Sequence, residues 1–183
     1  MRTCLLLTLV LIGACASAGK DPAAERRSDV TVVQNNDANG GMRMGTTELT
    51  DTREEVLPAK FAAVWSVLPV VYDSLGIPVT VRDPATGMVG NGGYDVRRLL
   101  GGTMVNRYFD CGEGRGGSSA LSYDLFVTVM SHVVEKSPGE TTLSTSTVVR
   151  ARPISNSGQW IRCETRGLLE QRIEAGVIAR LTK

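Results

Sequence analysis

The strongest constraint on the fold is a pair of long segments in which apolar and polar side chains alternate. Residues 121–133 and 141–151 both follow this pattern, and the turn-forming run Ser-Pro-Gly-Glu at residues 137–140 separates them. Because successive side chains of a strand point to opposite faces, the alternation predicts strands with one buried face. The sequence therefore predicts a meander of long antiparallel strands.

The two faces of the first segment differ in composition. The second face carries Asp124, Phe126, Thr128, Met130 and His132, and so is partly apolar. An apolar surface of this kind is expected to contact another element or a partner. The face predicted to lie in the core carries Leu121, Tyr123, Leu125, Val127, Val129 and Val133.

Two helices are predicted to cover the sheet, which gives an α+β fold: an antiparallel β-meander packed against two helices. Leu57-Pro58-Ala59 is expected to open the first helix, Gly76 to end it, and Thr165 to cap the second. Pro69 lies inside the first helix and is expected to kink it. The apolar stripes are Phe61, Val64, Trp65, Leu68, Val71, Tyr72 and Leu75 in the first helix, and Leu168, Leu169, Ile173, Val177, Ile178 and Leu181 in the second.

Shorter strands are predicted on either side of the first helix. After it, strands are expected at residues 77–81, 88–90 and 104–111, with an irregular glycine-rich segment between the last two. Before it, residues 30–33 are read as a short strand and residues 46–56 as an edge strand.

Three patterns mimic ligand sites and have a simpler structural explanation. Trp65 and Tyr72 are read as core residues rather than as an aromatic ligand box. The glycines at 112, 114 and 117 satisfy G-x-G-x-x-G, but a strand follows them where dinucleotide binding needs a helix, so a hairpin loop is expected. The Asn-rich turn at residues 35–41 resembles half of a calcium loop but has Thr46 where the bidentate glutamate belongs, which favours a plain turn.

The first fifteen residues have the order of a secretory signal: Arg2, a short apolar run and then small residues. Ile12-Gly13-Ala14-Cys15 resembles the lipobox of bacterial lipoproteins. That resemblance implies that residues 1–14 are removed as a signal peptide and that Cys15 is diacylated on sulfur. The alternatives are an ordinary signal peptide cut near Ala16 or Ala18, or an uncleaved anchor, although the apolar run is shorter than the roughly 20 residues of a spanning helix.

The remaining chain is divided by composition into a tether and one domain. Residues 15–28 are small and charged with no apolar periodicity, which predicts a lipidated flexible tether, and residues 29–183 are predicted to form a single α+β domain. The formal net charge of +1 argues against a nucleic-acid partner, because such a protein needs a basic face.

The cysteines of the domain are Cys111 and Cys163, and an oxidising envelope favours a disulfide between them. Two buried free thiols, or one reactive thiol, are the alternatives. The chain has one histidine, His132, so a Cys/His zinc cluster is nearly excluded, and neither a metal nor a cofactor is expected.

The order of elements resembles the helix-grip or BamC-like domains of envelope lipoproteins. The residues that carry this resemblance run from Leu57-Pro58-Ala59 through Trp65 and Tyr72 to Leu75-Gly76-Ile77, followed by Val81-Arg82-Asp83 and Gly87-Met88-Val89. BamC-like proteins are non-enzymatic accessory subunits of the machine that inserts barrels into the outer membrane. The resemblance therefore implies a protein-binding module.

These patterns predict a lipid-anchored, non-catalytic binding or assembly module that has an envelope protein partner and lies at the periplasmic face of an envelope membrane. Ala16 after Cys15, in place of aspartate, indicates the outer membrane in a cell that has two. The alternative is a carrier of a small apolar ligand, with Phe126 and Met130 lining a groove between helix and sheet. A triad of His132, Asp124 and Ser131 or Ser119 is not expected, because neighbouring side chains of one strand point apart.

Overall fold

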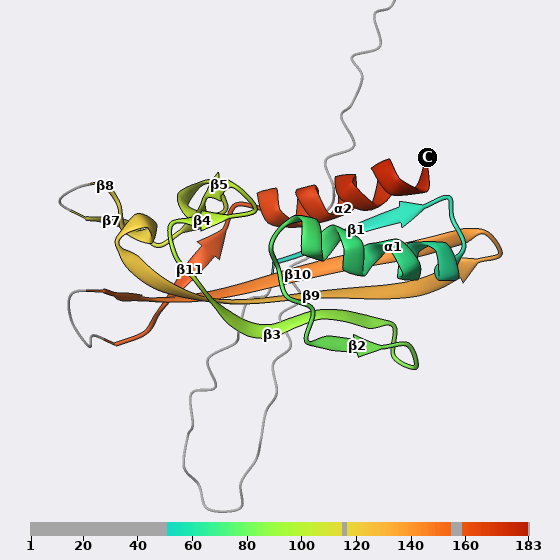
Figure 1. The fold of residues 1–183 in the computed structure, drawn as a ribbon, viewed down its shortest axis with the longest axis horizontal. Coiled ribbons are helices and arrows are strands. Elements are labelled where there is room, and N and C mark those ends of the chain that lie inside the picture. The colour runs from blue at the N-terminus through green and yellow to red at the C-terminus, as the bar shows by residue number, and fades with distance from the viewer. Residues whose placement is uncertain (1–50, 115–116, 155–158, 183) are drawn as a thin grey trace, which may run out of the picture.

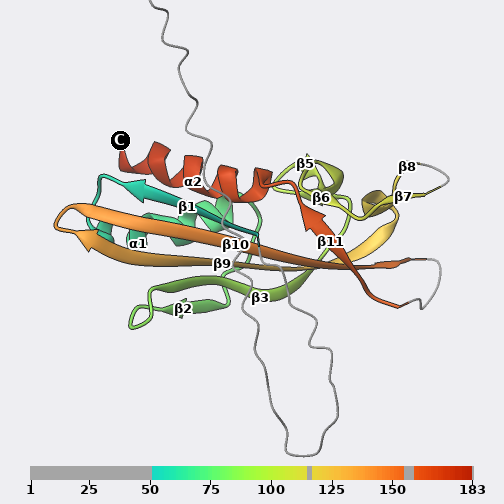
Figure 2. The same cartoon turned by 180° about the vertical axis from the view of Figure 1, so that it is seen from behind.

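A computed structural model describes residues 51–114, 117–154 and 159–182 of the 183-residue chain. The predicted signal peptide (1–14), the lipidated Cys15, the tether (15–28) and the strand and turn expected at residues 30–41 lie outside the described residues. The described part is a curved antiparallel sheet with two helices on one of its faces (Figures 1 and 2).

The centre of the sheet is a long hairpin of β9 (Tyr123–Ser137) and β10 (Glu140–Pro153). Strand β3 (Met88–Val96) pairs with the other edge of β9, and β2 (Val81–Asp83) pairs with β3. The free edge of β10 is shared between two strands. Strand β1 (Asp51–Leu57) pairs with residues 141–147 of β10, and β11 (Ile161–Thr165) with residues 149–151.

Short elements surround the end of the sheet at which β11 lies. Strand β6 (Phe109–Asp110) pairs with β11. Two small ladders join β4 (Leu99–Leu100) to β5 (Thr103–Met104) and β7 (Glu113–Gly114) to β8 (Gly117–Ser118). Of two 3₁₀ turns, η1 (Val105–Arg107) joins β5 to β6 and η2 (Ser119–Leu121) joins β8 to β9.

Helices α1 (Phe61–Ser74) and α2 (Leu168–Leu181) lie side by side over the sheet (Figures 1 and 2). They approach closely because Gly176 of α2 has no side chain: a Cβ there would lie 2.8 Å from Cγ1 of Val71 on α1. The core between helices and sheet is built from the predicted stripes, with Val64, Leu68, Ile173 and Val177 in the same buried cluster as Val127 and Val129 of the sheet.

The structure confirms the α+β class, with a mostly antiparallel sheet and two helices. The long central hairpin also follows the alternation in the sequence. The glycine-rich run forms the β7–β8 ladder of a hairpin, and the short turn η2 and then β9 follow it, with no α-helix between them.

Several expected boundaries are wrong. Leu57 does not open α1 but ends β1, where it pairs with Thr141 and is 2% exposed, and the helix begins at Phe61. Residues 104–111 are not one strand, because η1 interrupts them and buries Val105 and Tyr108 in a compact turn.

The remaining differences concern the ends of elements. Thr165 is not the N-cap of α2; that position is Gly167, in the left-handed conformation at φ 74°. The Thr165 hydroxyl accepts a hydrogen bond from the Gly167 amide and donates one to the buried Glu170. Ile178 was expected in the buried stripe and is exposed, and Leu121 belongs to η2 rather than to β9. Strand β3 runs on to Val96 past an irregularity at residues 91–94.

Candidate functional site: an arginine and aromatic patch on the open face of the sheet

The face of the sheet opposite the helices, which we call the open face, carries the even-numbered side chains of β9 and β10. Over residues 125–133 of β9 and 141–151 of β10 the odd-numbered side chains are buried, while the even-numbered ones between them are half-buried or exposed. Phe126 is 37% exposed on this face. The second face of this strand, predicted to be partly apolar and to contact another element or a partner, carries Phe126, which contacts Trp160.

The pairing of the strands brings residues distant in the sequence into one row on the open face. Asp95 on β3 pairs with Phe126 on β9, Phe126 with Arg150 on β10, and Arg150 with Arg162 on β11. In the neighbouring row Asp124 pairs with Arg152. Three arginines thus gather where β10 and β11 run together.

Trp160, just before β11, lies over this row and completes a cluster. Its ring makes an edge-on contact with Phe126 at 6.4 Å between ring centroids, and the Arg152 guanidinium carbon lies 4.8 Å from the centroid of the Trp160 ring. Both geometries are attractive, because the aromatic edge and the guanidinium are positive and the ring face is negative. We call this cluster the open-face patch; its members are Phe126, Val148, Arg150, Arg152, Trp160, Ile161 and Arg162.

A depression of about 280 Å³ lies within the open-face patch, lined by Val148, Arg150, Trp160, Ile161 and Arg162. Small-molecule pockets usually span about 300–1,000 Å³. The depression is open to solvent and partly walled by arginines, so its size and lining suit an inserted side chain better than an enclosed small ligand.

The charges of this region are unevenly distributed. Asp124 forms an ion pair with Arg97 at the end of β3, and its hydrogen bond raises the pKa of the Arg97 guanidinium, with Asp95 adding to the effect. The carboxylates of Asp124 and Asp95 therefore both favour the charged form of Arg97. Arg150 and Arg162 occupy paired positions of β10 and β11, so two positive side chains are neighbours across these strands.

Two glycines on β3, Gly90 and Gly93, lie directly beneath side chains of β9 on the open face. A Cβ at Gly93 would lie 2.2 Å from Cζ of Phe126, and one at Gly90 would lie 2.9 Å from Sδ of Met130, whereas Gly92 has open space. Phe126 and Met130 thus lie directly over backbone that has no side chain. This close approach explains Gly90 and Gly93.

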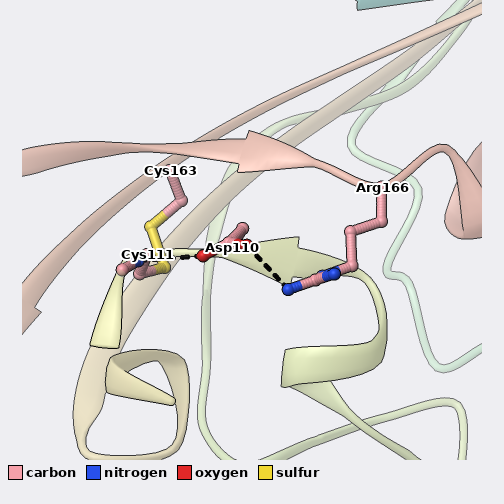
Figure 3. A network of polar contacts seen from close by, with 5 residues as sticks. Asp110, Cys111, Cys163 and Arg166 are labelled. Carbon is pink, nitrogen blue, oxygen red and sulfur yellow. Dashed lines mark hydrogen bonds and ion pairs between the residues drawn. A yellow bond between two sulfur atoms is a disulfide. The ribbon is translucent and has the colours of Figure 1, made fainter. Parts of the chain in front are cut away.

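The predicted cysteine pair is present at the margin of this region. Cys111 and Cys163 are both buried and are joined as a disulfide, with 4.4 Å between their Cα atoms. Asp110 accepts a hydrogen bond from the Gly112 amide and pairs with Arg166 at 2.7 Å, so it braces the same connection (Figure 3). The disulfide and this ion pair fasten the segment around β6 to β11.

The carrier hypothesis requires Phe126 and Met130 to line a groove between helix and sheet, and they do not line one. Both lie on the open face, because their even-numbered positions on β9 point away from the helices. Across the interior, Tyr72 of α1 is hydrogen-bonded to Ser131 at 2.9 Å, and Ser131 to Thr145 at 2.8 Å.

The aromatic residues of α1 are used in packing. Burial raises the pKa of Tyr72, and its side chain is fully buried. Trp65 is half-buried, stacks on Phe61 at 5.5 Å and lies 5.7 Å from the Arg82 guanidinium carbon. The two residues do not converge on one ligand space.

The structure does not bring the residues of the rejected triad together. Ser131 is buried beneath the helices while His132 is exposed on the open face, and Ser119 is buried in η2. In the described ranges, no group of three or more His, Cys, Asp or Glu side chains is placed to hold a metal ion.

Sequence reasoning missed the arginines of the open-face patch. The signal was available in part, because the alternation of residues 141–151 already places Arg150 on the opposite face from Val149. The pairing of Arg150 with Arg162, and the position of Trp160 beside Phe126, depend on strand order.

In comparisons with known proteins, no family model, no curated protein and no solved structure matched the chain. Within the part of the chain that the structure describes, neither helix has the length and hydropathy to cross a bilayer.

Proposed function

We propose that this chain is a lipid-anchored envelope protein whose folded part acts as a non-catalytic binding or assembly module for a membrane or envelope protein complex. The observation that carries the proposal is the open-face patch, an exposed group of aromatic and arginine side chains on a sheet face that neither helix covers. Interfaces are enriched in these residue types, since aromatic side chains and arginine contribute most of the binding energy.

The sequence supports the anchor and the location in this proposal. Ile12-Gly13-Ala14-Cys15 resembles a lipobox, and a diacylated Cys15 would hold the body at the periplasmic face of an envelope membrane. The helix-grip or BamC-like likeness belongs to the same proposal: a sheet with two helices on one face is compatible with it, and it too implies a protein partner. With a formal net charge of +1, we propose no nucleic-acid partner.

The proposal is tested by two measurements on the protein in its own cell. The intact mass of the membrane-extracted chain should show loss of residues 1–14 and the added mass of acyl chains. A photo-reactive side chain at Ile161, which lines the depression, should crosslink to an envelope protein. The matched control is Val70, which is 52% exposed on α1. Equal crosslinking from both positions, or a chain without acyl groups, would contradict the proposal.

A further inference from the structure

We infer that the open-face patch binds an extended acidic segment of the partner protein, whose carboxylates contact Arg152 and Arg162 and whose apolar side chain enters the depression beside Trp160. This inference rests on the proposed function and specifies the chemistry of the partner.

Charge complementarity selects an acidic occupant. Among the described residues, Arg162 is exposed and has no ion pair, and the carboxylate opposite Arg152, that of Asp124, is already paired with Arg97. Glu164 lies two residues along β11, on the same face as Arg162, and forms no ion pair with it in the described ranges. A carboxylate of the partner can therefore pair with Arg162 and with the neighbouring Arg152.

The spacing of the side chains selects an extended segment. Trp160 directly precedes β11 and Arg162 is the second residue of this strand, and two residues of extended chain span about 6.6 Å. Alternate side chains of an extended peptide have the same spacing. A segment lying along β11 can therefore place an apolar side chain against Trp160 and a carboxylate against Arg162 together.

The shape of the patch favours a protein segment over a lipid surface. Trp160 is held against Phe126 and beneath Arg152 rather than projecting, and the space between these side chains is a depression. A bilayer surface is bound best by aromatic side chains that protrude into it. A concave site with an aromatic wall is suited to receiving one side chain of a partner.

The test uses the chain extracted from membranes in a neutral detergent and a fluorescein-labelled peptide of alternating glutamate and leucine. Fluorescence anisotropy should show binding that weakens as NaCl rises from about 50 to about 300 mM, because the contacts are ionic. Arg162→Glu and Trp160→Ala should each weaken binding about tenfold or more. The control is Lys136→Glu, which makes a like change of charge at an exposed position near the far end of β9, ten residues from Phe126.

Three results of the direct binding measurements would overturn the inference. These are no binding of the peptide, equal binding of a peptide with glutamine in place of glutamate, and equal loss in Arg162→Glu and Lys136→Glu. Displacement of the peptide by phosphatidylglycerol added to the micelles would also overturn it, because the patch would then bind lipid headgroups. Each variant must keep the disulfide and the wild-type denaturation midpoint.

The crosslinking experiment separates this inference from the proposed function. Crosslinks from Ile161 that persist in Arg162→Glu would leave the binding module in place and refute the acidic segment. The opposite result is peptide binding that depends on Arg162 together with no crosslink to any envelope protein. It would support the acidic segment and refute the proposed binding or assembly module.

Discussion

Tyr72 and Tyr94 are both largely removed from solvent but differ in what their hydroxyl groups contact. The Tyr72 hydroxyl is hydrogen-bonded to Ser131, whereas the Tyr94 hydroxyl has no hydrogen-bond partner among the described residues. Tyr72→Phe should therefore lower the free energy of unfolding by about 0.5–1.5 kcal/mol, and Tyr94→Phe should leave it unchanged or raise it slightly. Urea denaturation measures both; an equal loss in the two variants would contradict the assignment.

The same tyrosines should make the fold sensitive to alkali. Burial raises the pKa of both phenols in the folded chain, while the unfolded chain titrates near the ordinary value of about 10. A folded pKa above the unfolded one stabilises the fold below the unfolded pKa, and that stability is lost as the pH rises above about 10. Urea midpoints at about pH 8 and about pH 11 should differ less in Tyr72→Phe than in the wild type. An unchanged difference would show that Tyr72 is not responsible.

Gly90 and Gly92 of β3 form a matched pair two positions apart. A Cβ at Gly90 would lie 2.2 Å from the carbonyl oxygen of Val129, which belongs to the backbone of β9 and cannot rotate away, whereas Gly92 has open space around it. Gly90→Ala should destabilise the chain by about 1–3 kcal/mol, as overpacking does, and Gly92→Ala by much less. Denaturation midpoints of the two variants decide the matter, and similar losses would mean that β3 does not approach β9 as described.

At the scale of elements, the disulfide closes the end of the sheet at which β11 lies. Cys111 and Cys163 are 52 residues apart in the sequence, and a loop of that length corresponds to about 4 kcal/mol in the chain-entropy account. Reduction should therefore lower the urea midpoint of the wild type strongly. The Cys111→Ser/Cys163→Ser double variant should resemble the reduced wild type and ignore reductant. A wild type that is equally stable with and without dithiothreitol would contradict a stabilising role.

The elements that the sequence predicts well are those whose pattern is local. Strands β9 and β10 were predicted from period-two alternation, and the buried stripes of α1 and α2 from helical spacing. The failures have tertiary causes. Leu57 satisfies a helix-start pattern but is drawn into β1 by pairing with β10, and residues 104–111 alternate in sequence but fold as a 3₁₀ turn around buried Tyr108.

For the whole molecule, the candidate site was predicted only as an apolar second face of one strand. Phe126 carries that prediction, but Arg150, Arg162 and Trp160 join it through the order β9, β10, β11, which no local pattern encodes. The disulfide could be predicted because elimination left two cysteines. A patch built from three strands requires their register, and a shift of one residue would move its side chains to the opposite face.

The predicted lipid anchor at Cys15 is separate from the folded core. The buried core within the described ranges runs from Leu57 to Val177, far in sequence from Cys15. Cys15→Ser should therefore abolish acylation. Chains of this variant whose signal is still cleaved should leave the membrane pellet. The urea midpoint of the folded part should stay as in the wild type. Intact mass, fractionation and denaturation measure the three quantities. A control substitution, Cys4→Ser, changes a cysteine of the predicted signal and should leave all three unaltered. A variant at Cys15 that keeps its acyl chains would place lipidation elsewhere, and one that loses stability would show that the anchor also supports the fold.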